Sequence, residues 1–132
     1  MSKAITSSRL AALPARIHQH RALSVSATAN AAKNQFILIA RDFTDPEAIT
    51  RRLNMRTKHL VEAKALKKSD QIHSAGALLS DHSDLGKMVG SVILFQADNA
   101  EEVRKLVERD YYVSGKVWEN YEILPFRSVD LS

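Results

Sequence analysis

A histidine, an arginine and an aspartate are the residues of this sequence whose types and positions best suit acid–base chemistry. The stretch MRTKHLVEAKAL, residues 55–66, has the spacing of an amphipathic helix. At about 100° per residue, His59 and Arg56 fall on its apolar side. The apolar residues assigned to that side are Ile49, Leu53, Leu60, Ala63 and Leu66. The core-facing side of this helix is therefore expected to carry an imidazole and a guanidinium.

A second predicted helix, residues 98–110, supplies the acid. Its apolar side ends in Asp110, so His59 and Asp110 could meet near one end of a sheet that both helices cover. A carboxylate that orients an imidazole is the simplest general acid–base pair, because an imidazole with a pKa of about 6.5 exchanges protons at neutral pH. The spacing equally permits a satisfied core histidine and an aspartate that closes the next turn by a local hydrogen bond.

Three further residues are assigned to substrate binding. Arg56 lies one turn before His59 and could hold a carboxylate, an enolate or a phenolate. Ser74 and Gly76 come from an apolar segment, residues 71–80, that is expected to form a strand of the same sheet. The expected ligand is a small anionic or phenolic molecule.

The sequence offers little support for other kinds of catalytic, metal or cofactor site. The sequence has no cysteine, which excludes disulfides, thiolate nucleophiles and zinc sites built on sulfur. His18 and His20 lie in an N-terminal segment that is not expected to fold, and the polar cluster DHSD, residues 81–84, is typical of a turn between strands. We found no GxGxxG, P-loop, GxSxG or HExxH motif, and we expect no metal and no cofactor.

The elements that must position these residues follow the order βαββαβ. Asp45 and Pro46 are expected to begin the first helix, and Asp98 or Asn99 the second. The expected elements are strands 36–41, 71–80, 89–97 and 116–126 and helices 46–68 and 98–110. This order predicts an α+β, ferredoxin-like fold in which both helices cover one face of an antiparallel sheet. The other face then needs a cover, so we expect a homodimer.

The positive charge is concentrated at the N-terminus. The 132-residue chain has a net charge of +4, but residues 1–34 carry five Lys and Arg and no acidic residue, which leaves 14 Lys and Arg against 15 Asp and Glu in the rest. A Ser-, Ala- and Arg-rich segment without acids is typical of a mitochondrial transit peptide. We therefore expect a matrix protein with one folded domain, residues 35–132; the alternative is a basic tail that binds RNA or an acidic partner.

The length and hydropathy limit the remaining classes. A chain of 132 residues is one domain's worth, and it contains no apolar run of the roughly 18 residues needed to cross a bilayer. The basic and aromatic pattern of an RNA-binding sheet is absent from the folded part. We expect neither nucleic-acid binding nor membrane insertion.

Four stretches of the chain resemble the YCII-related (YciI-like) family. They are RTKHL (56–60), SAGAL (74–78), GSVILFQADNAEEVRKLVERDYYVSGKV (90–117) and EILPF (122–126). The resemblance covers residues 36–129 and implies a dimeric α/β barrel of ferredoxin-like subunits, with a His–Asp pair as the active site. It places that pair at His59 and Asp110. Two positions depart from the family pattern, Tyr111 for the usual proline and Ala77 within a segment that is commonly Ala-Gly-Pro, and both could reshape the rim of a pocket.

Two functions remain open from the sequence. The first is an acid–base enzyme of the lyase or isomerase type, because the resemblance includes a relative that acts in the breakdown of chlorinated aromatics. The second is a non-catalytic dimeric module that binds or senses a small molecule in the same pocket.

Overall fold

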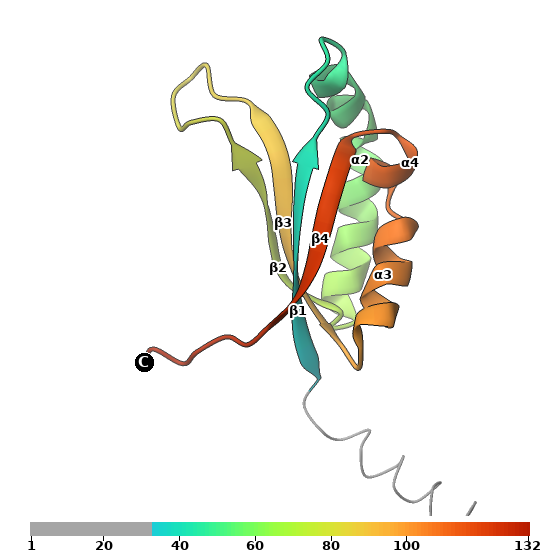
Figure 1. Ribbon diagram of the computed structural model, residues 1–132, viewed down its shortest axis with the longest axis vertical. Helices are drawn as coiled ribbons and strands as arrows, with labels where there is room; N and C mark the ends of the chain where they lie inside the picture. Colours follow the sequence, from blue (N-terminus) through green and yellow to red (C-terminus); the bar gives the residue numbers. More distant parts are fainter. Residues whose placement is uncertain (1–32) are drawn as a thin grey trace, which may run out of the picture. The chain divides into compact units, whose positions relative to one another are not determined.

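The computed structural model describes residues 33–132, which form one α+β unit (Figure 1). The elements in chain order are β1 (Asn34–Asp42), α2 (Ala48–Lys68), β2 (Ile72–Leu79), β3 (Met88–Ala97), α3 (Ala100–Glu108), α4 (Tyr111–Ser114) and β4 (Trp118–Phe126). The segment predicted to be a transit peptide, residues 1–34, lies almost entirely outside the described residues. Its role stays a prediction.

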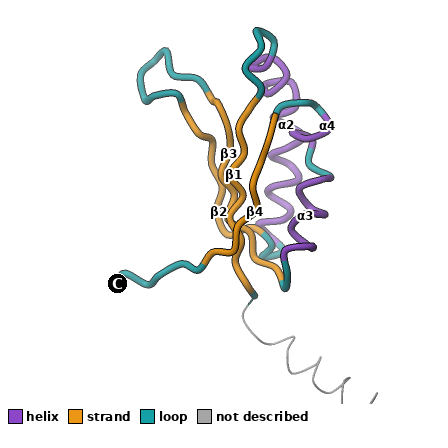
Figure 2. Tube along the Cα trace, in the orientation of Figure 1, coloured by secondary structure: helices purple, strands orange, loops and turns teal. Residues whose placement is uncertain are grey.

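The four strands form one antiparallel sheet in the order β2-β3-β1-β4. The helices lie on one face of it, as Figures 1 and 2 show. This arrangement confirms the predicted ferredoxin-like fold. The predicted strands agree with the observed ones to within two residues at each end, because alternating β-branched and aromatic residues bounded by turns mark strands clearly.

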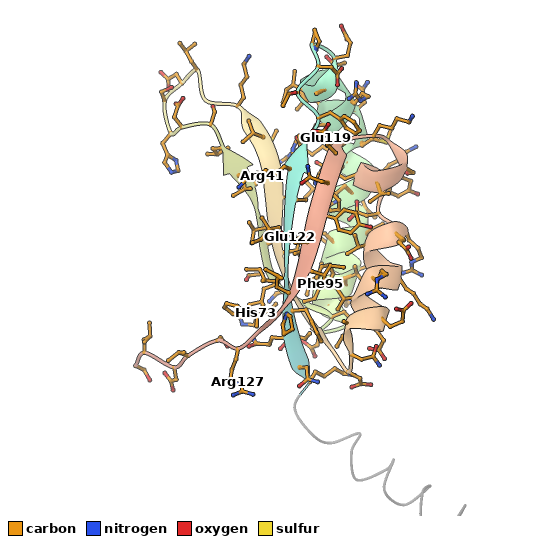
Figure 3. The ribbon with its side chains drawn as sticks, in the orientation of Figure 1. Arg41, His73, Phe95, Glu119, Glu122 and Arg127 are labelled. Carbon is orange, nitrogen blue, oxygen red and sulfur yellow. The ribbon has the colours of Figure 1, made fainter. Side chains whose placement is uncertain are left out.

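The core lies between the sheet and the helices. Leu38 of β1, Ile93 of β3 and Val103 of α3 are at most 2% exposed there. Phe95 also points from β3 toward the helices, whereas Arg41 points from β1 to the other side (Figure 3). The alternation along β1 and β3 thus gives the sheet one face that packs against the helices and one open face.

The open face is apolar over much of its area. Ile37 and Ile39 of β1 are half-buried, as are Val92 and Leu94 of β3, and Leu124 of β4 is 42% exposed. Glu122 pairs with Ile39 and places one acid among them. Within residues 33–132 no element covers this face, and the predicted homodimer stays a prediction.

The start of α2 differs from the predicted one. The helix begins at Ala48, two residues after Pro46, because residues 45–47 form a turn in which Ala48 N donates to Asp45 O. Asp45 accepts from Glu47 N within that turn and does not cap the helix. At α3 the predicted cap is present, since the Asn99 side chain accepts from Glu102 N.

None of the helices in the described part of the chain has the length and apolar character needed to span a bilayer.

Candidate functional site

His59 and Asp110 are in direct contact. His59 Nδ1 lies 2.8 Å from Asp110 Oδ1, and their side chains are only 10% and 17% exposed. The ionised carboxylate can only accept, so the imidazole nitrogen donates and carries the proton at Nδ1. The contact predicted from the two helix patterns is therefore present. It leaves His59 Nε2 free to act as a base or, when protonated, as an acid.

The secondary structure around Asp110 differs from the predicted one. The second long helix was expected to run to Asp110, but α3 ends at Glu108, and Asp110 has extended backbone dihedrals (φ −66°, ψ 138°) as the N-cap of the short helix α4. Its Oδ1 also accepts from Tyr112 N at 2.8 Å. The local hydrogen bond weighed as an alternative to the His–Asp pair is therefore present together with it, on the same oxygen atom.

Tyr112 fixes the plane of the imidazole. Its ring stacks on His59 with 3.8 Å between ring centroids and 7° between ring planes, and Trp118 meets both rings edge-on. Burial raises the pKa of Tyr112, so this phenol keeps its proton at neutral pH. The hydrogen bond to Asp110 and the stacking on Tyr112 together hold His59 in one orientation.

A cavity of about 220 Å³ adjoins the histidine. It lies between α2 and strands β2 and β3. The lining residues are Arg52, Arg56, His59, Leu60, Ala63, Ala75, Gly76, Ala77, Met88, Ser91, Ile93 and Tyr112. None of them is acidic, and two are arginines. A cavity of this size, with an apolar wall and a cluster of donors, suits a small anionic ligand.

A second, smaller cavity lies on the Asp110 side of the imidazole. It measures about 30 Å³, enough for a water molecule, and both His59 and Asp110 line it. Glu62 and Arg109 line it as well. The imidazole therefore borders a cavity of ligand size and a cavity of water size.

Arg52 is the charged residue at the centre of the buried side of α2. The buried positions of that helix are Ala48, Arg52 and His59, whereas Leu53 is 55% exposed and Arg56 is also exposed. The predictions that Leu53 and Arg56 face the core are thus wrong. The prediction placed the buried side of the helix from its apolar residues alone. The observed buried side includes Arg52, so it is rotated from the predicted one by a fraction of a turn.

Arg52 forms a buried network below the cavity. Its Nη1 donates to both oxygens of Asp42 at 2.8 Å, and its Nη2 donates to Ser91 Oγ at 2.9 Å. The guanidinium carbon also lies 4.8 Å from the centre of the Tyr112 ring. Burial raises the pKa of Asp42, although the hydrogen bonds from Arg52 act in the opposite direction.

Sequence reasoning missed this network, although one signal for it was present. Asp42 and Ser91 occupy inward positions on strands β1 and β3, where a polar residue interrupts an apolar alternation. Arg52 follows Asp42 by ten residues, on a helix whose inward side already contains a histidine. Polar residues at core positions need partners, so these three could have been paired with one another.

The predicted substrate-binding residues are placed differently from one another. Arg56 and Gly76 line the cavity, but Ser74 does not. The β2–β3 register shifts between Ile72 and Ser74, so Ser74 pairs with Leu94 of the open face and its hydroxyl lies 3.4 Å from His73 Nδ1. The bulge turns Ser74 to the other side of the sheet, and its assignment to this cavity is corrected.

Two other possible arrangements, an ion pair between Asp110 and Arg56 and a cluster of metal ligands, are absent from the described range. Asp110 contacts His59 there and forms no ion pair with Arg56. In the same range, no group of three or more His, Asp or Glu side chains is arranged to hold a metal ion.

The sequence matches the YCII-related domain over residues 35–127. The chain belongs to the YCII-related family. It is 26% identical over 99 residues to fusaric acid biosynthesis protein 2 of Gibberella fujikuroi, covering 71% of this chain and 93% of that protein. It is also 26% identical over 97 residues to protein YciI of Escherichia coli, covering 71% and 97%.

One solved structure shares the fold of this YCII-related chain. It is 5-chloro-2-hydroxyhydroquinone dehydrochlorinase (TftG) from Burkholderia phenoliruptrix, in complex with 2,5-dihydroxybenzoquinone. The TM-score is 0.62 at 21% identity, and the match covers 70% of this chain and 93% of the dehydrochlorinase.

Proposed function

We propose that this YCII-related protein is an acid–base enzyme of the lyase or isomerase type that acts on a small anionic or phenolic molecule. The observation that carries the proposal is the 2.8 Å contact between Asp110 Oδ1 and Nδ1 of His59, a histidine that lines a cavity of about 220 Å³. Both side chains are mostly buried, as a working pair of this kind requires.

The two residues have separate tasks. Asp110 accepts the Nδ1 proton of His59, which selects the tautomer with an unprotonated Nε2 and stabilises the imidazolium that forms when Nε2 takes a proton from the substrate. Tyr112 limits rotation of the ring by stacking on it. Arg56 is exposed and lines the cavity, where its positive charge can attract an anionic group.

The substrate class follows from the lining of the cavity and from the related proteins. Arg56 supplies a positive charge at a cavity whose lining includes no acidic residue, which favours an anion, and the wall of alanines and Ile93 favours an apolar skeleton. The dehydrochlorinase of the same fold acts on a hydroxylated, chlorinated ring. Loss of HCl from such a ring requires a base that removes a proton while chloride departs with the bonding electrons, and His59 is suited to that step.

The alternative is a module that binds the same class of molecule without changing it. One observation favours this alternative: Asp110 Oδ1 also caps α4 by accepting from Tyr112 N, which is sufficient reason for an aspartate at this position. In that case His59 would contribute to binding and to packing only.

Two further parts of the proposal concern assembly and location. A homodimer is supported by the apolar open face of the sheet, and a mitochondrial matrix location by the Ser-, Ala- and Arg-rich composition of residues 1–34. Sedimentation of wild type and of a Leu94→Arg variant tests the first, since a charge on that face should produce monomers. Imaging of a fluorescent protein fused to residues 1–34 tests the second.

The function itself is tested in two steps. A thermal-shift screen of hydroxylated quinones, phenols and small carboxylates identifies ligands, including 2,5-dihydroxybenzoquinone. Chloride release from 5-chloro-2-hydroxyhydroquinone and chemical change of each stabilising compound are then measured for wild type, His59→Gln and the exposed-histidine control His73→Gln. Ligands that bind but are never altered would leave only the binding module.

A further inference from the structure

Two buried hydrogen-bond donors, on residues that line the cavity, have no acceptor among residues 33–132. The first is the Nε–H of Arg52, a residue whose side chain is 3% exposed and whose four other N–H groups lie on Nη1 and Nη2. Nη1 is used by Asp42 and Nη2 by Ser91, whereas Nε is buried without a partner. An unpaired buried donor next to a guanidinium charge is costly, so its retention calls for an acceptor from outside the chain.

The second donor is the hydroxyl of Ser91. Its oxygen accepts from Arg52 Nη2 at 2.9 Å and from Trp118 Nε1 at 3.1 Å. A serine oxygen has two acceptor lone pairs, and these two donors occupy both. The hydroxyl hydrogen must therefore point elsewhere, and no acceptor for it is present in the described residues, although Ser91 is only 3% exposed.

Both residues line the cavity of about 220 Å³ that His59 borders. We infer that Ser91 Oγ–H and Arg52 Nε–H bind an anionic oxygen of the ligand, such as a phenolate, an enolate or a carboxylate oxygen. This assignment rests on the proposed function only for the choice of cavity, and it deepens that function by naming the residues that select an anion.

The geometry explains why a buried ion pair lies beneath the cavity. Asp42 holds the guanidinium in place through Nη1 and offsets much of its charge, while Nη2 and the Trp118 indole orient the serine. The ligand then meets two donors that are already fixed, so little conformational entropy is lost on binding. A neutral ring of equal size would leave both donors unpaired and would bind less tightly.

The test uses the 15N-labelled full-length protein and two probes of similar shape, 4-nitrophenolate and nitrobenzene. The Nε–H signal of Arg52 is assigned by its loss in Arg52→Lys and is followed during each titration. We expect 4-nitrophenolate to move this signal downfield with saturation and nitrobenzene to leave it unmoved. This measurement needs no destabilised variant.

Variants then test the Ser91 hydroxyl and distinguish anion binding from catalysis by His59. Ser91→Ala should weaken 4-nitrophenolate binding about tenfold or more. Ser74→Ala, which removes a hydroxyl from the opposite face of the sheet, should not change it. Because the Nε–H signal and the Ser91→Ala affinity are measured without turnover, failure of the enzyme proposal leaves this inference standing. The inference would be overturned if 4-nitrophenolate did not move the Arg52 Nε–H signal or if both probes moved it equally. It would also be overturned if binding were lost in His59→Gln but kept in Ser91→Ala.

Discussion

The imidazole of His59 lies flat against the phenol ring of Tyr112, with 3.8 Å between the ring centroids. The same tyrosine donates its backbone N–H to Asp110, the acid that His59 contacts. Helix α4, only four residues long, thus supplies the stacking partner of the histidine and holds its acid in place. Changes in α4 should therefore affect the histidine without changing it directly.

Replacement of Asp110 by asparagine should separate its two roles. An asparagine side-chain oxygen can still accept from Tyr112 N, so α4 should keep its cap and the free energy of unfolding should change little. The carboxylate that stabilises the imidazolium is lost, so turnover should fall by about 10²–10⁴-fold. Asp110→Ala should lose the cap as well and cost roughly 0.5–2 kcal/mol in stability by chemical denaturation. Equal turnover in wild type and Asp110→Asn would show that the carboxylate serves only as a cap.

The buried pair between Asp42 and Arg52 should be far more important for stability than a surface pair. Asp42→Asn leaves the 3%-exposed guanidinium without its counter-charge and should lower the free energy of unfolding by about 3–5 kcal/mol. The matched control is Arg104→Gln, which breaks an exposed pair with Glu101 and should cost at most about 1 kcal/mol. Urea unfolding of both variants measures the difference, and similar losses in the two would contradict the account of the network.

Gly115 should be needed for the close approach of α4 to α2. A Cβ at this position would lie 2.5 Å from Met55 Cγ and 2.8 Å from the Tyr111 carbonyl oxygen. Gly115→Ala should therefore displace α4, lower the melting temperature and disturb the stacking of Tyr112 on His59. Gly76→Ala is the control, because its Cβ would meet no atom within 4 Å in the described structure. Calorimetry and the ring signals of His59 measure both effects; an unchanged Gly115→Ala protein would show that α4 is loosely packed.

Asp45 should titrate at unusually low pH. Two hydrogen bonds from Arg51, at 2.7 and 2.8 Å, hold the pKa of Asp45 at about 2, below its ordinary 3.8. Since the folded pKa is the lower one, the stabilisation from this pair is present above pH 3.8 and is lost as the pH falls toward 2. Carboxyl 13C NMR of wild type and Arg51→Gln checks this, and the pKa should return toward 3.8 in the variant. A titration midpoint that Arg51→Gln does not move would rule out the guanidinium as the cause.

The fold and the contact between His59 and Asp110 could be predicted because both depend on periodic patterns. Apolar alternation located the strands, and helical spacing put the histidine on the side that faces the sheet. The family resemblance pointed to the same two residues. Asp110 was found for a partly incorrect reason, since it caps a separate short helix and does not continue α3.

The remaining parts of the site depend on features that no apolar pattern records. Arg52 occupies a core position that a hydrophobic reading gives to Leu53, and only the pairing with Asp42 makes that burial possible. Ser74 was assigned to the cavity because it lies on a predicted strand of the sheet, but the register shift between Ile72 and Ser74 pairs it with Leu94 of the open face. The Ser91 hydroxyl is held by hydrogen bonds from Arg52 and Trp118, which lie far from it in the sequence.

The most direct test of the central claim, that His59 moves protons to and from a bound ligand, is solvent deuterium incorporation at carbon. The strongest-binding phenol or carboxylate from the thermal-shift screen is incubated in D2O with wild type, His59→Gln and His73→Gln, and its C–H signals are followed by NMR. The account predicts exchange catalysed by wild type and His73→Gln and slowed at least 10²-fold in His59→Gln. Exchange at the same rate in His59→Gln, or no catalysed exchange by wild type, would contradict it.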